Sequence, residues 1–199
     1  LIADGVLVKI RGAHVGLPDR MNLVVGRLSC SPSGHGFVVP EARREGQTDL
    51  YVAAANIREA LHGDRVVARV ERRTAKGAEG RIIRILERAN QRIVGRFEVD
   101  GPFGGHVVPF DRRVLHELFL PAGGEGGAVA GQMVAADMTR PPTATRNPVG
   151  RVTEVLGNLT DPGVDLKVIV SKYGLPDAFP AEVEEEAQRA ARPVGADEV

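Results

Sequence analysis

The sequence predicts an all-β chain of two tandem OB-type barrels of five strands each, with an N-terminal hairpin and a short C-terminal helix. The first observation behind this prediction is an internal repeat. Residues 24–27 return as residues 93–96, and residues 38–40 return as residues 107–109, each sixty-nine positions later. Three more matches keep the same order at offsets of sixty-eight to seventy: residues 50–52 with 118–120, 62–67 with 130–135, and 80–82 with 150–152. Self-similarity at a nearly fixed period indicates a repeated structural unit.

The second observation is a series of short apolar runs separated by turn residues. In the first copy, residues 23–88, the predicted strands are residues 23–28, 36–39, 49–52, 65–72 and 80–87, with a helical turn within residues 53–61. Five such strands in roughly sixty-five residues are typical of a small closed barrel. The second copy, residues 89–160, repeats this plan and adds a Gly-rich loop over residues 122–130.

Two segments lie outside the copies. Residues 1–22 predict a hairpin, with strands at residues 6–10 and 14–17 around a turn. Residues 161–199 predict a strand at residues 163–171 and a helix from Pro180 to Ala191, whose first turns carry four glutamates. Such acidic residues favour a helix start, because they face the positive end of the helix dipole. The chain opens in mid-pattern, so we expect it to be a piece of a longer protein.

Composition excludes several classes of protein. The single cysteine, Cys30, rules out an intramolecular disulfide and a multi-cysteine metal site, and it favours a reducing cytoplasm. No apolar run approaches membrane-spanning length and no signal peptide is visible, so no membrane partner is expected.

The net charge of zero conceals two halves of opposite sign. Residues 1–92 hold 16 Lys/Arg against 10 Asp/Glu, and residues 93–199 hold 10 against 16. A basic half suits a polyanion, and the alternative is a solvated basic surface.

The first copy contains an aromatic pattern that suits nucleic acid. His35 and Phe37 fall on one face of a predicted strand, since side chains alternate along a strand. Tyr51 points outward from the next strand by the same rule. Outward aromatic rings on neighbouring strands form a platform on which bases stack. Alternation disfavours the other interpretation, that Phe37 and Tyr51 are core residues, whereas a contact from His35 is left open.

Single-strand binders combine such platforms with a cationic groove. Arg65 and Arg69 share one face of their predicted strand, and Arg27 and Arg81 add to the positive charge. In the second copy, Phe119 keeps the position of Tyr51.

The rest of the second platform is altered. His106 replaces Phe37, Gly104 replaces His35, and Phe103 is displaced by one position. The second platform is therefore expected to be the weaker of the two.

These motifs carry a resemblance to a known family. Residues 34–37 (GHGF) and 49–52 (DLYV) resemble the paired ribonucleoprotein motifs of cold-shock domains. The usual first motif is Gly-aromatic-Gly-Phe, and in this chain His35 stands at the position of its first aromatic residue. Further motifs resemble bacterial ribonucleases R, a branch of the ribonuclease II family of processive 3′→5′ exoribonucleases: residues 16–22 (GLPDRMN), 62–66 (HGDRV), 80–82 (GRI), 148–152 (PVGRV) and 154–157 (EVLG). The resemblance runs from Leu1 to about residue 190.

The resemblance implies a domain order. Residues 1–22 would end a winged-helix domain, residues 23–88 and 89–160 would be two cold-shock/OB domains, and residues 161–199 would lead into a catalytic domain. The family's catalytic aspartates and their magnesium ions would lie beyond Val199, and no residue here matches them. We therefore expect no catalytic residue, cofactor or metal site within this chain. The acidic run at residues 182–186 is interpreted as a solvated helix start.

The predicted function is the binding and guiding of single-stranded RNA for a ribonuclease R-type exoribonuclease, by electrostatic capture and base stacking. We expect a cytoplasmic monomer whose partners are single-stranded RNA and the catalytic domain of the same polypeptide. One alternative is a free-standing single-strand binder or RNA chaperone, and another is a pair of OB domains that docks proteins. Salt dependence separates the nucleic-acid binders from the protein-docking pair.

Overall fold

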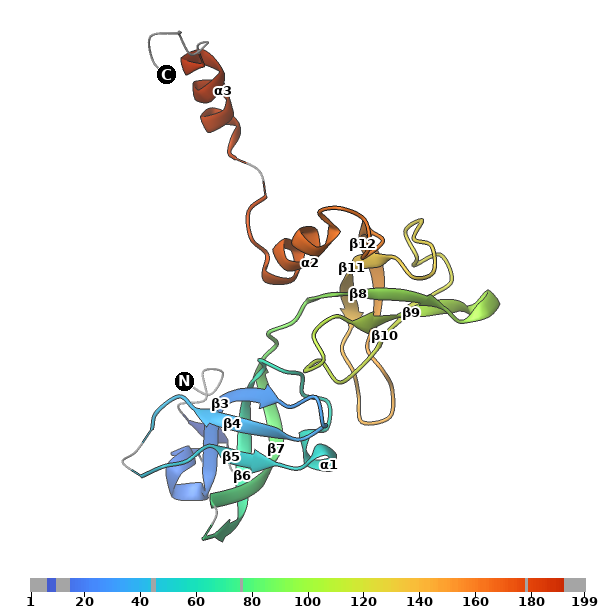
Figure 1. Cartoon of the computed structure of the whole chain (residues 1–199). Helices are drawn as coiled ribbons and strands as arrows, with labels where there is room; N and C mark the ends of the chain where they lie inside the picture. Colours follow the sequence, from blue (N-terminus) through green and yellow to red (C-terminus); the bar gives the residue numbers. More distant parts are fainter. Residues whose placement is uncertain (1–6, 10–14, 44–45, 76, 178, 192–199) are drawn as a thin grey trace.

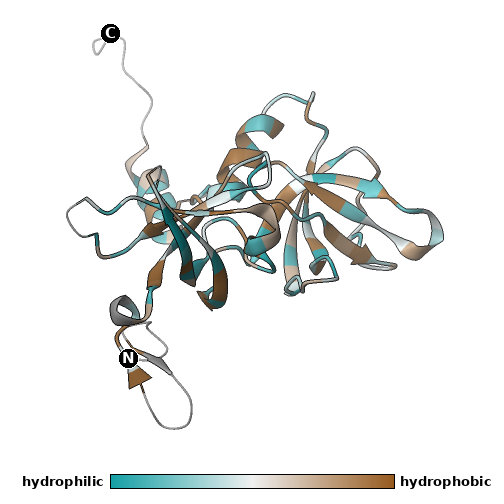
Figure 2. Cartoon of the chain, turned by 90° about the horizontal axis from the view of Figure 1, so that it is seen from below, coloured by the Kyte–Doolittle hydropathy of each residue, from teal (hydrophilic) through white to brown (hydrophobic). Residues whose placement is uncertain are grey.

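Two closed five-stranded barrels follow one another along the chain (Figure 1). The computed structural model describes residues 7–9, 15–43, 46–75, 77–177 and 179–191. Apolar and polar residues alternate along several of the strands, as the bands of colour in Figure 2 show. The predicted all-β fold with two OB-type domains is confirmed.

The first barrel is formed by β3 to β7. Their bounds are β3 Leu23–Cys30, β4 Gly36–Pro40, β5 Leu50–Val52, β6 Arg65–Thr74 and β7 Gly77–Glu87. Around the barrel the strands run in the order β3-β4-β5-β7-β6, and all neighbours are antiparallel except β5 and β7. A short helix, α1 (Ala54–Ile57), follows β5 where the sequence predicts a helical turn.

Alternation fills this barrel with small and medium aliphatic side chains. Val38 on β4 and Val52 on β5 are fully buried, whereas Phe37 and Tyr51, the residues directly before them, point outward. The buried cluster consists of Leu28, Cys30, Val38, Leu50, Val52, Ile57, Ala60, Val66, Ala68 and Ile82. The core of the barrel is therefore built from the inward side chains, and the outward side chains of β4 and β5 are available for contacts with a ligand.

The second barrel repeats the first. It comprises β8 Arg92–Val99, β9 Gly104–Pro109, β10 Leu118–Pro121, β11 Met133–Arg140 and β12 Val149–Gly157, with a short 3-10 helix, η2 (Gly101–Phe103), before β9. The strand order matches that of the first barrel, and β10 and β12 form the parallel pair. Phe97 is the largest fully buried side chain.

The repeated glycines Gly26 and Gly95 occupy equivalent positions, where each strand closely approaches its neighbour. A Cβ added to Gly26 on β3 would collide with the carbonyl oxygen of Val39, and one added to Gly95 on β8 would collide with that of Val108. Each glycine therefore lets two strands cross closely at the same place in its barrel.

The loop before β6 also recurs before β11. Gly63 and Gly131 have φ angles of 87° and 91°, a conformation that favours glycine. One residue later, Asp64 Oδ2 accepts a hydrogen bond from the Leu61 backbone N–H at 2.9 Å, and Gln132 Oε1 accepts one from that of Val129 at 2.9 Å. The sequence repeat thus extends to individual hydrogen bonds.

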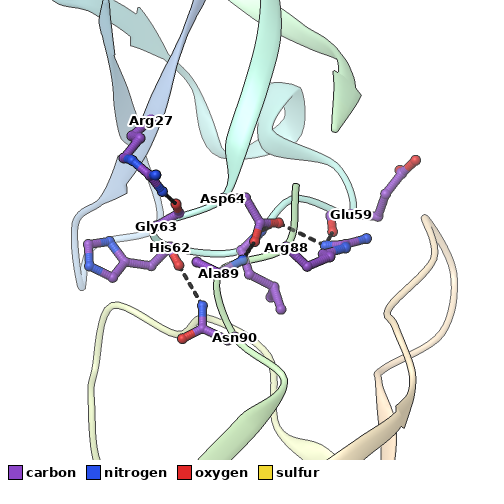
Figure 3. A network of polar contacts seen from close by, with 9 residues as sticks. Arg27, Glu59, His62, Gly63, Asp64, Arg88, Ala89 and Asn90 are labelled. Carbon is purple, nitrogen blue, oxygen red and sulfur yellow. Dashed lines mark hydrogen bonds and ion pairs between the residues drawn. The ribbon is translucent and has the colours of Figure 1, made fainter. Parts of the chain in front are cut away.

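Asp64 does more than its counterpart, because it also holds the segment between the barrels (Figure 3). Its side chain is fully buried, and Oδ1 accepts a hydrogen bond from the Ala89 N–H at 2.9 Å. Oδ2 accepts another from Arg88 Nη1 at 2.9 Å, and Arg88 in turn donates to the Glu59 carbonyl at 2.6 Å. Asn90 donates to the His62 carbonyl at 2.6 Å. These bonds fix the start of the linker to the first barrel.

The prediction of a strand at residues 163–171 is wrong, because this segment forms helix α2 (Val164–Tyr173). Gly163 and Gly174 flank the helix in left-handed conformations, and Val164 and Val168 are spaced to share one helical face. Both valines are buried against Val94, Met133, Ala135 and Leu156 of the second barrel. An apolar run of this length fits a strand as well as one face of a helix, so its sequence alone does not distinguish the two.

At the two ends of the chain, the described elements agree better with the elements predicted from the sequence. Helix α3 (Ala181–Ala190) forms where a helix is predicted, and the described part of residues 1–22 contains β1 (Val8–Lys9) paired antiparallel with β2 (Val15–Gly16). A 3-10 helix, η1 (Pro18–Met21), precedes β3. The predicted turn at residues 11–13 and residues 6, 10 and 14 of the predicted hairpin strands lie outside the described residues. None of the described helices combines the length and apolar character that a membrane crossing needs.

Candidate nucleic-acid interface

Three aromatic rings meet on the outer face of the first barrel. Phe37 on β4 and Tyr51 on β5 are direct cross-strand partners, with ring centroids 5.7 Å apart. His35, just before β4, lies 5.7 Å from Phe37 and 5.6 Å from Tyr51. The structure therefore brings together all three predicted aromatic residues as one aromatic triad.

The triad is accessible to a ligand. Phe37 is 39% exposed although it is a large apolar side chain, and His35 and Tyr51 are half-buried. The hydroxyl of Ser33 lies 3.1 Å from His35 Nδ1, which helps to orient the imidazole. An aromatic ring left in water costs apolar burial, so this arrangement suits a surface that is covered by a partner.

A groove of about 570 Å³ adjoins the triad. It is lined by Phe37, Thr48, Asp49, Tyr51, Thr74, Gly77, Ala78 and Glu79. Two rings of the triad thus form one wall, and the ends of β6 and β7 supply much of the rest. The size falls within the range of small-ligand pockets, roughly 300–1,000 Å³.

Ion pairs at the groove keep its charge balanced. Arg43 Nη2 lies 2.6 Å from Asp49 Oδ1, and Arg72 Nη2 lies 2.6 Å from Glu79 Oε2. Both arginines are mostly exposed, with 57% and 69% of their side chains accessible. The sequence prediction missed these two arginines, because their pairing depends on contacts between distant parts of the chain.

The predicted cations do not gather at the triad. Arg65 and Arg69 lie on β6, which pairs with β3 and β7 rather than with β4 or β5. Arg69 faces Arg81 across the strands, and Arg81 Nε lies 3.0 Å from Glu71 Oε1. Arg27 and Arg81 are closer by register, because each lies two residues along its strand from the direct partner of a triad ring, Ser29 opposite Phe37 and Glu79 opposite Tyr51.

Arg65 is engaged by a carboxylate. Its Nε and Nη2 donate to the two carboxylate oxygens of Glu41 at 2.6 and 2.8 Å. These hydrogen bonds hold the pKa of Glu41 below its usual range, against the opposing effect of burial. Much of the positive charge of this region is therefore matched locally.

The second barrel repeats the register with different side chains. Phe119 on β10 is the direct partner of His106 on β9, as Tyr51 is of Phe37. His106 Nδ1 lies 2.9 Å from Asp100 Oδ2, so part of the imidazole is occupied by a carboxylate. Phe119 is 37% exposed, and Phe103 in η2 is 78% exposed. The second platform pairs one phenyl ring with a histidine, where the first holds a phenyl ring, a phenol ring and a histidine.

The described residues show neither a reactive cysteine nor a cluster of metal ligands. Cys30 is buried, and burial together with the nearby Asp64 raises the pKa of its thiol to about 11, so it stays protonated at neutral pH. No group of three or more His, Cys, Asp or Glu side chains is placed to hold a metal ion within the described ranges.

Two family models match the chain, one on each barrel. The ribonuclease B OB domain matches residues 26–85, from β3 into β7. The cold shock domain matches residues 106–180, from β9 past α2.

Curated relatives cover most of the chain. It is 41% identical over 184 residues to ribonuclease R of Acidithiobacillus ferrooxidans, which covers 90% of this chain and 41% of the relative. Identity is 34% to ribonuclease R of Vibrio cholerae and 33% to that of Escherichia coli, each over 92% of this chain and 22% of the relative. The chain thus spans about two fifths of the first of these relatives and about a fifth of the other two.

Solved structures share the fold. Mycoplasma genitalium RNase R in complex with ribose methylated single-stranded RNA aligns with a TM-score of 0.72 and 21% identity, over 85% of this chain and 27% of that one. Yeast Ssd1, a pseudonuclease, aligns with a TM-score of 0.62 and 16% identity, over 77% and 25%. At these identities the likeness concerns the fold alone.

Proposed function

The chain is a ribonuclease R-like pair of OB and cold-shock domains, and from this premise we propose that it binds single-stranded RNA and guides the strand towards the catalytic part of a 3′→5′ exoribonuclease. The observation that carries the proposal is the aromatic triad, an exposed group of three rings on the outer face of β4 and β5. RNA in complex with Mycoplasma RNase R, a structure of the same fold, supports it.

In the proposed mechanism, aromatic rings stack on the bases and arginines attract the phosphates. Unstacked bases lie against Phe37 and Tyr51, because every base has a flat face and stacking tolerates any sequence. The arginines of the first half, most of them exposed, attract the phosphate backbone at longer range. Because several of these arginines are held by carboxylates, stacking carries more of the binding than the net charge of that half suggests.

Affinity for single-stranded RNA should fall as salt rises. If about three to five phosphates are neutralised, the slope of log K against log salt should be roughly −2 to −3.5, at about −0.7 per contact for single strands. Fluorescence anisotropy of a labelled U-rich oligonucleotide between about 50 and 300 mM salt measures this slope. A flat titration, or binding only to proteins, would favour the protein-docking alternative.

A further inference from the structure

Two carboxylates stand beside a surface proposed to bind a polyanion. Asp49 lies two residues before Tyr51, so both side chains project from the same face of the chain. Glu79 on β7 is the direct cross-strand partner of Tyr51. Both acidic residues line the groove beside the triad. A base stacked on Tyr51 therefore has one carboxylate along the strand and another across it.

In each carboxylate, only one of the two oxygens is bonded to an arginine. Asp49 binds Arg43 through Oδ1, and Glu79 binds Arg72 through Oε2. Oδ2 of Asp49 and Oε1 of Glu79 have no hydrogen-bond partner among the described residues, and their side chains are 34% and 39% exposed. The arginines offset the negative charge, so the carboxylates can lie near a phosphate backbone without a large repulsion.

An ionised carboxylate only accepts hydrogen bonds, so it selects bases by their donors. Guanine presents two adjacent donors on its Watson–Crick edge, N1–H and the N2 amine. Cytosine and adenine present one amine beside an acceptor nitrogen, and uracil presents a single N–H between two carbonyl oxygens. A carboxylate therefore favours guanine, then the other amine-bearing bases, and favours uracil least.

We propose that the groove beside the triad reads the edge of the base stacked on Tyr51, with Asp49 and Glu79 as the specificity-determining residues and guanine as the preferred base. This inference rests on the proposed function, since it assigns a base preference to the same RNA-binding surface. Thr48 and Thr74 add hydroxyl groups to the wall, and Gly77 and Ala78 leave room for a ring. Arg43 and Arg72 act as charge partners that hold the carboxylates in place.

The test compares eight-nucleotide oligouridines that differ at one central position, which carries guanine, inosine or uracil. The guanine oligonucleotide should bind the whole chain at least about fivefold more tightly than the all-uracil one, as a single well-placed base contact allows. Inosine lacks the N2 amine and should bind with intermediate affinity. Equal affinity for all three would overturn the inference.

Amide variants assign the preference to the two side chains. Asp49→Asn and Glu79→Gln should each bring the guanine-to-uracil affinity ratio closer to one, even if the lost negative charge strengthens binding to every oligonucleotide. Asp137→Asn is the matched control, because Asp137 is also an exposed partner of an arginine, Arg92, but lies on β11 in the other barrel. It makes the same change in net charge and should keep the ratio of the parent chain.

The outcomes separate this inference from the function on which it rests. If the parent chain binds no oligonucleotide, the proposed RNA binding fails. If it binds all of them but the ratio is one, or if neither groove variant changes the ratio, only the base-reading inference fails. Because the parent chain is compared with three oligonucleotides, the inference stays falsifiable should one variant not fold.

Discussion

Replacing Asp64 with alanine should lower the free energy of unfolding of the first barrel by about 3 kcal/mol or more, the usual cost of breaking a buried, hydrogen-bonded ion pair from one side. Asp64 is fully buried and accepts hydrogen bonds from Leu61, Arg88 and Ala89. The alanine variant leaves two backbone N–H groups and part of a guanidinium without these acceptors. For a domain of this size, the loss corresponds to a melting temperature lower by about 12 °C or more.

Native-state hydrogen exchange of the amides in β3 to β7 measures this loss for the first barrel alone, because each amide reports the stability of its own region. The matched control is Asp137→Ala. That carboxylate pairs with Arg92, but both side chains are nearly half exposed, so the loss should stay within about 1 kcal/mol. Equal exchange rates in the parent chain and Asp64→Ala would show that the linker contacts of Asp64 are not needed for stability.

Removing either main ring of the triad should weaken RNA binding strongly. Phe37→Ala and Tyr51→Ala should each cost about 1–3 kcal/mol, the usual loss for one base–aromatic stack. In the second barrel, His106→Ala should cost less, because the imidazole is smaller and is already bonded to Asp100. Phe119→Ala should lie between, since its phenyl ring is exposed but its cross-strand partner is the imidazole of His106 rather than a second large ring.

Binding isotherms with a U-rich single strand measure these losses. Each variant needs a thermal melt as its control, because either ring also covers part of its barrel. Phe37 and Tyr51 variants that melt like the parent chain yet bind RNA unchanged would eliminate the stacking platform. Binding would then have to rest on charge alone.

Much of the fold could be predicted because the strands carry local signals. Alternation along residues 34–39 correctly assigned Phe37 to the outer face and Val38 to the core. The repeat added a second, independent copy of the same pattern, so each strand of one barrel supported its equivalent in the other. The triad followed, since the direction of a side chain and the pairing of neighbouring strands decide which rings meet.

Other features depended on contacts that sequence patterns do not contain. The spacing of Val164 and Val168 fits a helix, yet a short apolar run does not distinguish a helix from a strand until the surface that it covers is known. That surface is the outside of the second barrel, which buries both valines. In the same way, the partners of Arg43 and Arg72 are set by how loops and strand ends meet, so neither arginine was predicted.

The position of the bases on the first barrel is the most direct test of the account. Nuclear Overhauser effects between a bound oligouridine and the isotope-labelled chain report which rings lie against the bases. The account predicts contacts from the base protons to the rings of Phe37 and Tyr51, with upfield shifts of those base protons from stacking. Saturating, salt-sensitive binding with base contacts only elsewhere, and none to either ring, would contradict it.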